Sequence, residues 1–284
     1  ALWLTGRVGA LLPGLGWLDL LFLPTVAGLT LARIVRARNH RNLQVPAMFL
    51  ALAGLDAWHH LDPDAHALRP AVHVVVAVVA LVAGRIVPAF TRNALRQRGM
   101  TVDCTTPKWL DRLAVPAVLA VAVAEIAAPQ SVAGAGLAAF AAVVLLARMA
   151  RWHSLESRSQ PILWILHLGY LWLPLGLALE AAAVFCAWPS PTAALHALTA
   201  GAIGTMILAV ATRAALGHSG RPLKVSPPII VAYVLVLAAA AVRVFVPGTF
   251  AIFTAGTLWC LSFAVFFAVY FPILTRPRVD GKPG

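Results

Sequence analysis

The chain has 284 residues, of which 61% are hydrophobic and only 11% are charged, whereas charged residues make up about a quarter of an ordinary soluble domain. This composition excludes a typical soluble protein and indicates a bundle of helices in a membrane. The net charge of +12 comes from Lys and Arg residues in short loops between apolar runs, where a membrane topology signal explains them better than a nucleic-acid surface does.

Apolar runs of membrane-spanning length recur along the chain, each closed by charge, Pro or Gly. A helix needs about 20 such residues to cross about 30 Å of hydrocarbon. We expect nine complete helices, at residues 17–35, 43–59, 71–90, 109–128, 132–150, 162–187, 192–212, 227–246 and 249–272. Residues 1–12 are apolar but too short to span, and they do not form a signal peptide.

The sequence therefore predicts an all-α, polytopic transmembrane bundle. We expect one transmembrane helical domain over residues 1–284, with nine complete helices and a partial N-terminal one. Because the chain opens on Ala, partway into an apolar run, we also expect that it begins within a longer protein.

The connections between these helices alternate in charge. Segments 33–41, 91–99, 148–158, 213–224 and 275–284 are all basic. The intervening connections, at 61–69, 128–131, 187–192 and 246–249, hold one Lys or Arg between them. By the positive-inside rule the basic set lies in the cytoplasm, so the C-terminus is expected to be cytoplasmic.

Two of the runs share a pattern. The segments VHVVVAVVALVAGRIVPAFTRNAL (72–95) and LHALTAGAIGTMILAVATRAAL (195–216) both begin beside a His and both end in Thr-Arg-x-Ala-Leu. They lie four helices apart, which is consistent with a four-helix internal repeat. Low-complexity Ala and Val sequence can also produce such a likeness by chance.

Ionisable side chains at bilayer depth cost several kcal/mol by insertion scales, so they are candidates for function. Within the predicted helices and at their ends these are Asp56, Arg85, Glu125, Glu180, Arg213 and Arg243. Glu180 lies deep enough to need a partner, for which Arg243 or a proton relay are the options. Arg85 could instead extend its guanidinium to the cytoplasmic face.

Histidines on several helices could converge to hold haem or a transition metal. His196 is the best placed, because Ala200 and Gly204 follow at i+4 and i+8 and would leave a flat space beneath the imidazole. The same small residues also suit close helix packing. His167 lies among aromatic residues, where a hydrogen bond between helices is as good an explanation as ligation.

Four segments then resemble one known family in order and spacing. They are RNLQVPAMFLALAGLDAWHHL (41–61), GRIVPAFTRNALRQRG (84–99), LHLGYLWLPLGLAL (166–179) and HALTAGAIGTMILAVATRAALGHSGR (196–221). Together they resemble the NnrS family of haem- and copper-containing membrane proteins. The resemblance implies a twelve-helix protein, of which this chain would hold the C-terminal three-quarters, and a distant similarity to the main subunit of haem-copper oxidases.

The resemblance also implies cofactors and residue roles. Haem and copper are the expected cofactors, and the histidines that match family motifs, and so could bind metal, are His60, His167, His196 and His218. His73 matches only the internal repeat and is a weaker candidate for cofactor binding. The resemblance does not say which histidine would hold haem iron and which copper.

A role in nitric oxide metabolism or nitrosative-stress resistance is implied, in the inner membrane of denitrifying or nitric oxide-exposed bacteria. Membrane lipid and nitric oxide or a related small ligand are the expected partners. One alternative is an ion- or proton-coupled transporter or channel lined by Asp56, Glu125, Glu180 and Arg243. Another is a non-catalytic accessory protein that handles a metal or cofactor, so whether the protein is an enzyme stays open.

Overall fold

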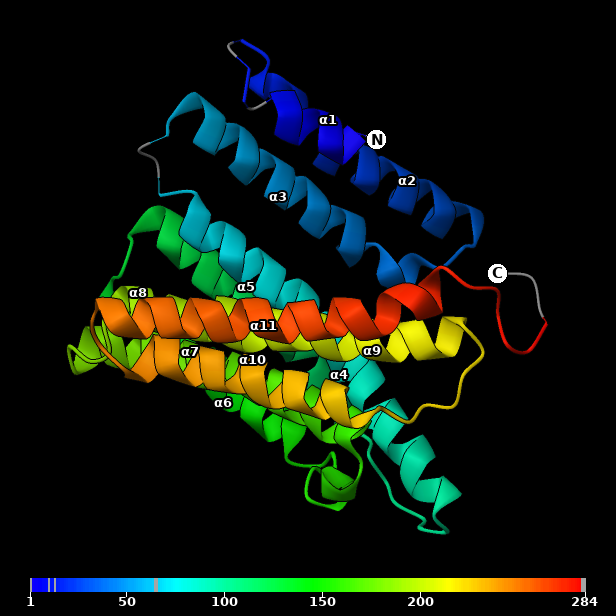
Figure 1. Ribbon diagram of the computed structural model, residues 1–284. Coiled ribbons are helices and arrows are strands. Elements are labelled where there is room, and N and C mark those ends of the chain that lie inside the picture. The colour runs from blue at the N-terminus through cyan, green and yellow to red at the C-terminus, as the bar shows by residue number, and fades with distance from the viewer. Residues whose placement is uncertain (1, 10, 13, 64–65, 282–284) are drawn as a thin grey trace.

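A computed structural model of the chain describes residues 2–9, 11–12, 14–63 and 66–281. Every regular element in these ranges is a helix (Figure 1), which confirms the all-α prediction. In chain order the α-helices are α1 Leu2–Gly9, α2 Phe22–Arg36, α3 Gln44–Leu61, α4 Leu68–Gln97, α5 Lys108–Ala127, α6 Val132–Met149, α7 Pro161–Phe185, α8 Pro191–His196, α9 Thr205–His218, α10 Pro227–Phe245 and α11 Thr249–Leu274.

Four shorter elements complete the order. Three are 3-10 helices, η1 Gly16–Leu21, η2 His40–Asn42 and η3 Glu156–Ser159. The fourth, η4 Ala197–Gly204, is a π-helix that joins α8 to α9 without a break. Each of the nine apolar runs is therefore helical, with α8, η4 and α9 together forming one of them.

Seven helices in the described ranges are long and apolar enough to cross a membrane. These are Gly16–Arg36, α4, α6, α7, Pro191–His218, α10 and α11. The two remaining predicted spans, α3 and α5, are helical but do not meet that standard. Polar residues account for the difference, since α3 holds Asp56, His59 and His60, and α5 holds Asp111, Arg112 and Glu125.

Local sequence explains where several helices begin. Ser131 precedes α6 and its hydroxyl accepts a hydrogen bond from the Gly134 backbone N–H, at 3.1 Å. Ser190 precedes α8 and accepts from the Ala193 N–H, at 3.2 Å. Pro occupies the first turn of α7, α8 and α10. The first N–H groups of a helix have no partner within it, and the Ser side chains bond to such a group whereas Pro lacks one.

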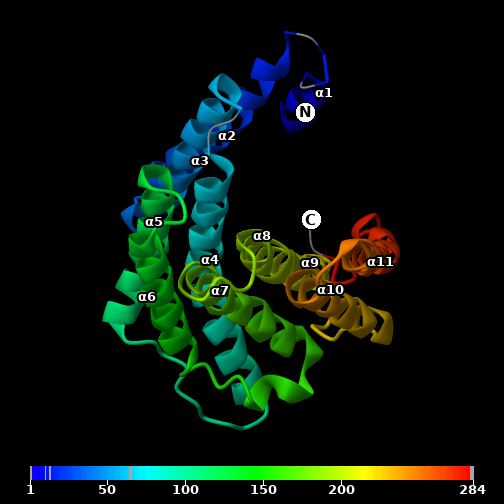
Figure 2. The same cartoon turned by 90° about the vertical axis from the view of Figure 1, so that its left-hand side faces the viewer.

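Helix α7 lies at the centre of the bundle and packs against α4, α6, α8, η4 and α9. Figure 2 shows α5 and α6 on one side of α4 and α7, and α8 to α11 on the other. Helices α10 and α11 pack along each other, as do α2 and α3. The outer helix α11 exposes large apolar side chains such as Phe250, Phe253 and Phe267, as expected of a surface in contact with lipid.

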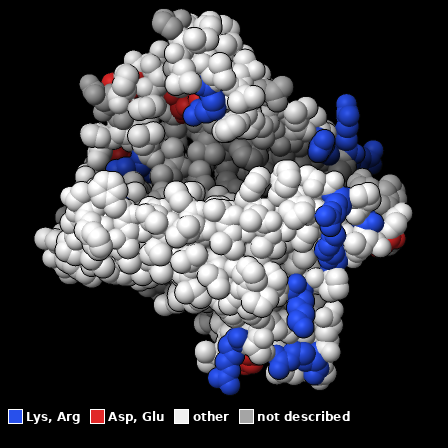
Figure 3. All heavy atoms as spheres, in the orientation of Figure 1, with Lys and Arg blue, Asp and Glu red and all other residues white. Residues whose placement is uncertain are grey.

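Basic side chains are unevenly spread over the surface. On the face drawn in Figure 3, most Lys and Arg gather toward the end of the molecule where α2, α4 and α9 finish. The alternation of loop charge along the sequence thus corresponds to two chemically different ends of the bundle.

Candidate functional site

The helix that carries His196 changes its winding directly after that residue. Residues Ala197–Gly204 form a π-helix, in which backbone bonds run from i to i+5 and which is frequent at functional sites. Close packing against α7 accompanies it: a side chain at Gly201 would collide with the Trp172 ring, and one at Gly176 of α7 would collide with Leu198. Small residues on both helices therefore let η4 and α7 approach closely.

The small residues that follow His196 lie at or beside one cavity. Ala200 lines the same cavity as His196. Gly204 faces Trp259 of α11, which also lines that cavity, since a Cβ at Gly204 would lie 3.1 Å from Trp259 Nε1. Ala200 therefore leaves room beside the imidazole, and Gly204 leaves room for the indole of Trp259.

The cavity at His196 has a volume of about 390 Å³ and lies between the α8–η4 helix, α10 and α11. Small residues form much of its wall, namely Ala200, Ala239, Ala255 and Gly256. Its polar members include Arg243 of α10, and no described carboxylate lies within ion-pair distance of that guanidinium. The cavity thus combines an imidazole, a cation and a wall that is nearly flat because small side chains form it.

Contacts with Thr199 favour one tautomer of His196. The Thr199 hydroxyl lies 3.2 Å from the Leu195 carbonyl oxygen, to which it donates. His196 Nδ1 lies 3.3 Å from the same hydroxyl oxygen, a contact that suits a protonated Nδ1, and in that tautomer the neutral ring keeps its lone pair on Nε2. Among the described residues Nε2 makes no hydrogen bond, which is the state that a metal-binding imidazole requires.

A second polar group lies between α4, α5 and α7, with three buried members and a half-buried Arg69. Arg69 Nε donates to Glu125 Oε2 at 2.8 Å, and Arg69 Nη2 lies 3.6 Å from Glu180 Oε1. His73 Nε2 lies 2.8 Å from Glu180 Oε2, and His73 Nδ1 lies 2.8 Å from the Arg69 carbonyl oxygen. We call these four residues, Arg69, His73, Glu125 and Glu180, the polar cluster.

One proton of the polar cluster lies between His73 and Glu180. Both ring nitrogens of His73 face oxygen acceptors, so either the imidazole is doubly protonated or Glu180 carries the proton. In both cases the two acids and the two bases sum to zero charge. Charge neutrality explains how the cluster can be buried, because an unpaired ion there would be costly.

The polar cluster corrects the expectation for Glu180. Its partners are Arg69 and His73 rather than Arg243. Arg69 was missed as a functional candidate, although it had a signal: it is the one basic residue in the four connections that otherwise lack Lys and Arg. With both nitrogens engaged, His73 has no lone pair to offer a metal in this arrangement.

His167 joins α7 to α4 through hydrogen bonds. The Thr91 hydroxyl donates to the Val87 carbonyl at 2.9 Å, so it accepts from His167 Nε2–H, at 2.8 Å. His167 Nδ1 then accepts from the Ser154 hydroxyl, at 2.9 Å. His167 is buried and neutral in this pattern, which matches the helix-to-helix alternative rather than ligation.

The other candidates lie apart from these groups. His60 and His218 are exposed at the ends of α3 and α9, and His60 Nδ1 lies 3.1 Å from the Asp56 carbonyl oxygen. Arg85 donates to Asn42 Oδ1 at 2.6 Å, and Arg213 lies over the Phe90 ring at 3.7 Å. No three His, Cys, Asp or Glu residues of the described ranges form a group that could hold a metal ion.

These positions fit haem and copper differently. One imidazole suffices to hold haem iron, and His196 offers one beside a cavity. A copper site needs several nitrogen or sulfur ligands, and the described residues do not bring such a set together.

Comparison with known proteins adds one finding. The model of a family described as NnrS protein matches residues 1–278, which is nearly the whole chain. No curated protein and no solved structure matches significantly.

Proposed function

The chain belongs to the NnrS family, and from this premise we propose that it is a haem-binding protein of the bacterial inner membrane that acts in nitric oxide metabolism or nitrosative-stress resistance. Its C-terminus lies in the cytoplasm, and His196 is the protein ligand to the haem iron. Copper belongs to the proposal only through the family resemblance.

The observation that carries the proposal is the free Nε2 of His196 beside the cavity. Contacts with Thr199 favour the tautomer that leaves Nε2 unprotonated. Ala200 and Gly256 give the wall little relief, which suits a planar ligand, and Arg243 can pair with a carboxylate such as a haem propionate. Haem would supply an iron at which a small diatomic ligand binds.

Haem titration of the purified chain in detergent tests this proposal. We expect the wild type to develop a Soret band whose position indicates histidine ligation, and His196→Ala to weaken or shift that band. Added imidazole should restore it, because a free imidazole can enter the space that the side chain vacates. His40→Ala is the matched control, since His40 is exposed and lies outside both buried sites.

An unchanged Soret band and an unchanged reduction potential in His196→Ala would exclude His196 as the ligand. A band that is lost in His196→Ala and not restored by imidazole would indicate that the variant has lost its fold rather than its ligand. Circular dichroism of the same samples separates these two results.

A second candidate function is proton- or ion-coupled transport, and the polar cluster is the observation that favours it. Its single proton between His73 and Glu180 lies inside the bundle, where titratable groups often mark proton pathways. Purified protein that holds neither iron nor copper but drives uptake into proteoliposomes would favour transport. Bound metal without nitric oxide turnover would favour an accessory role in metal or cofactor handling.

A further inference from the structure

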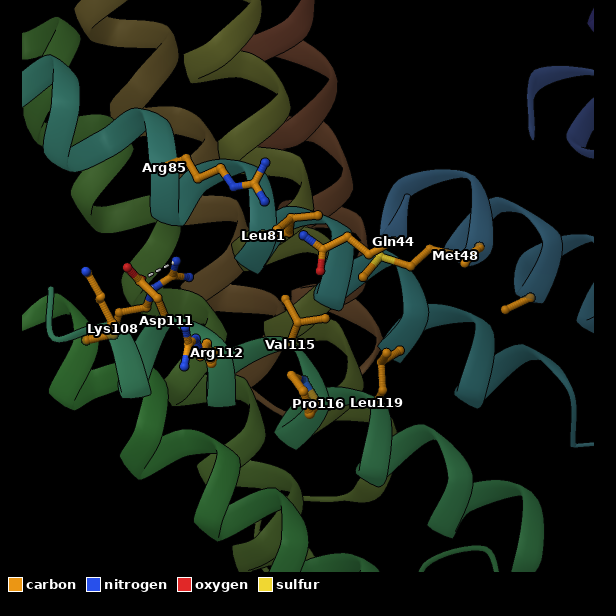
Figure 4. Close-up of a pocket in the computed structure, with 13 residues that line it drawn as sticks. Gln44, Met48, Leu81, Arg85, Lys108, Asp111, Arg112, Val115, Pro116 and Leu119 are labelled. Carbon is orange, nitrogen blue, oxygen red and sulfur yellow. Dashed lines mark hydrogen bonds and ion pairs between the residues drawn. The ribbon is translucent and has the colours of Figure 1, made fainter. Parts of the chain in front are cut away.

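A cavity of about 820 Å³ lies between α3, α4 and α5 and shares no lining residue with the cavity at His196. Figure 4 shows Lys108, Asp111 and Arg112 toward one side of it and Met48 and Leu119 toward the other. One half of the cavity is therefore charged, and the other is apolar apart from Gln44. This arrangement suits an amphiphilic ligand, with a charged headgroup at one end and an apolar chain at the other.

The charged half is built to be positive. Its one carboxylate, Asp111, accepts from Arg148 Nε at 2.8 Å and lies 2.7 Å from Arg148 Nη2. Arg148 is almost fully buried, and its Nη1 also donates to the Ala80 carbonyl at 2.7 Å. Gly84 makes this possible, because a Cβ at that position would occupy the place of the Arg148 guanidinium.

The remaining cations of this half stand in excess of the acids. Arg148 neutralises Asp111, so the positive charges of Lys108 and Arg112 are not balanced by a carboxylate in the cavity lining. Among the described residues, no carboxylate lies within ion-pair distance of Lys108 or Arg112. Lys108 also opens α5, where the helix N-terminus further favours an anion.

The two halves are correctly placed for a membrane. Gln44, Lys108 and Arg148 lie at or near the ends of α3, α5 and α6 that join the basic segments of the sequence. The apolar residues Met48, Val115 and Leu119 follow one or more turns into their helices, toward the bilayer interior. Trp109, which is exposed beside the charged half, is of the type enriched at membrane interfaces.

We propose that this cavity binds an anionic glycerophospholipid, with its phosphate against Lys108 and Arg112 and an acyl chain along Met48, Val115 and Leu119. Basic pockets between helices at the cytoplasmic side are known to suit anionic headgroups. Charge complementarity selects the headgroup, and the apolar half selects a lipid over a free phosphate ion. The site is independent of the haem proposal, so either can fail alone.

Thermal unfolding of the whole chain in detergent tests the site with three added ligands: phosphatidylglycerol, phosphatidylcholine and inorganic phosphate. We expect phosphatidylglycerol to raise the unfolding temperature and the other two to leave it unchanged. In the double variant Lys108→Gln/Arg112→Gln, the half-saturating concentration of phosphatidylglycerol should rise at least about tenfold, because two charge-assisted contacts to the phosphate are lost. The matched control, Lys224→Gln/Arg276→Gln, removes one exposed Lys and one exposed Arg outside the cavity.

Equal responses of the double variant and the control to phosphatidylglycerol would overturn the proposal. An equal shift with inorganic phosphate would also overturn it, because the site would then select an anion and not a lipid. A wild-type measurement guards against a variant that does not fold: a phosphatidylglycerol analogue with a photoreactive acyl chain should label α3 and α5 around Met48 and Leu119. Labelling confined to other helices would refute the placement of the acyl chain.

Discussion

The charge balance of the polar cluster predicts that Glu180→Gln and Arg69→Gln differ in stability, although each replaces one charged side chain with an amide. In Glu180→Gln, His73 can release its second proton, so that Arg69 and Glu125 still pair and the cluster stays neutral. The new amide can donate to His73 Nε2, and every hydrogen bond is retained. We expect this variant to lose only about 1 kcal/mol of unfolding free energy, the net worth of one altered hydrogen bond.

Arg69→Gln should be far more damaging. It leaves Glu125 and Glu180, both buried, with His73 as their only cation. Removing one partner of a buried ion pair costs about 3–5 kcal/mol, because the other charge remains without compensation. The two variants should therefore differ by at least about 2 kcal/mol.

Equilibrium unfolding in mixed micelles, followed by tryptophan fluorescence as the denaturing detergent is increased, measures this difference. The double variant Arg69→Gln/Glu125→Gln restores neutrality, because His73 and Glu180 then balance each other, and it should be more stable than Arg69→Gln alone. If Arg69→Gln and Glu180→Gln are equally stable, or if the double variant is the least stable of the three, neutrality is not what permits this cluster to be buried.

Three further outcomes follow from the contacts. Thr91→Val removes the acceptor for His167 Nε2–H and should lower the free energy of unfolding by about 1–3 kcal/mol. Thr91→Ser keeps the hydroxyl and should lower it less. Equal losses in the same unfolding assay would contradict the hydrogen-bond assignment. Gly84→Ala displaces Arg148 from its place beside Asp111 and should destabilise the protein by roughly 1–3 kcal/mol. The control Gly136→Ala has open space around its Cβ and should be neutral or stabilising. If Gly84→Ala is also neutral in the unfolding assay, Arg148 can rearrange freely. Burial raises the pKa of the Cys104 thiol, so that less of it is the reactive thiolate at a given pH. Iodoacetamide at pH 8 should therefore label Cys104 more slowly than the exposed Cys186. Mass spectrometry of the labelled peptides measures the two rates, and faster labelling of Cys104 would show that its loop opens.

Local features of the sequence were enough to predict the helices. Runs of apolar residues closed by Pro, Gly or charge determine a helix within a few turns, and all nine such runs are helical. The N-terminal ends at Pro161, Pro191 and Pro227 follow from the same local chemistry. Helices α3 and α5 fall short of the standard that the other seven meet because polar residues lie within them, and whether they span the membrane stays a prediction.

The partners of the polar residues could not be predicted in this way. Glu180 meets His73 from 107 positions away, and Arg69 meets Glu125 from 56, and nothing in either local sequence specifies these pairs. The hydrogen bonds of His167 were foreseen only as one of two alternatives. The π-helix after His196 has no signal in the sequence, because a stretch of Ala, Gly, Leu, Ile and one Thr is compatible with either winding. The metal-binding roles of His60, His167, His196 and His218, and the cofactor-binding role of His73, stay predictions.

The π-helix makes the length of the segment after His196 as important as its composition. A π-helix closes its backbone bonds from i to i+5 and so holds more residues per turn than an α-helix. Deleting one residue from Ala197–Gly204 should let this segment close as an α-helix with His196 still directed toward Arg243 and α11, whereas inserting one residue should rotate the imidazole away from them. The direction of the proposed ligand thus depends on a residue count, which no single substitution would reveal.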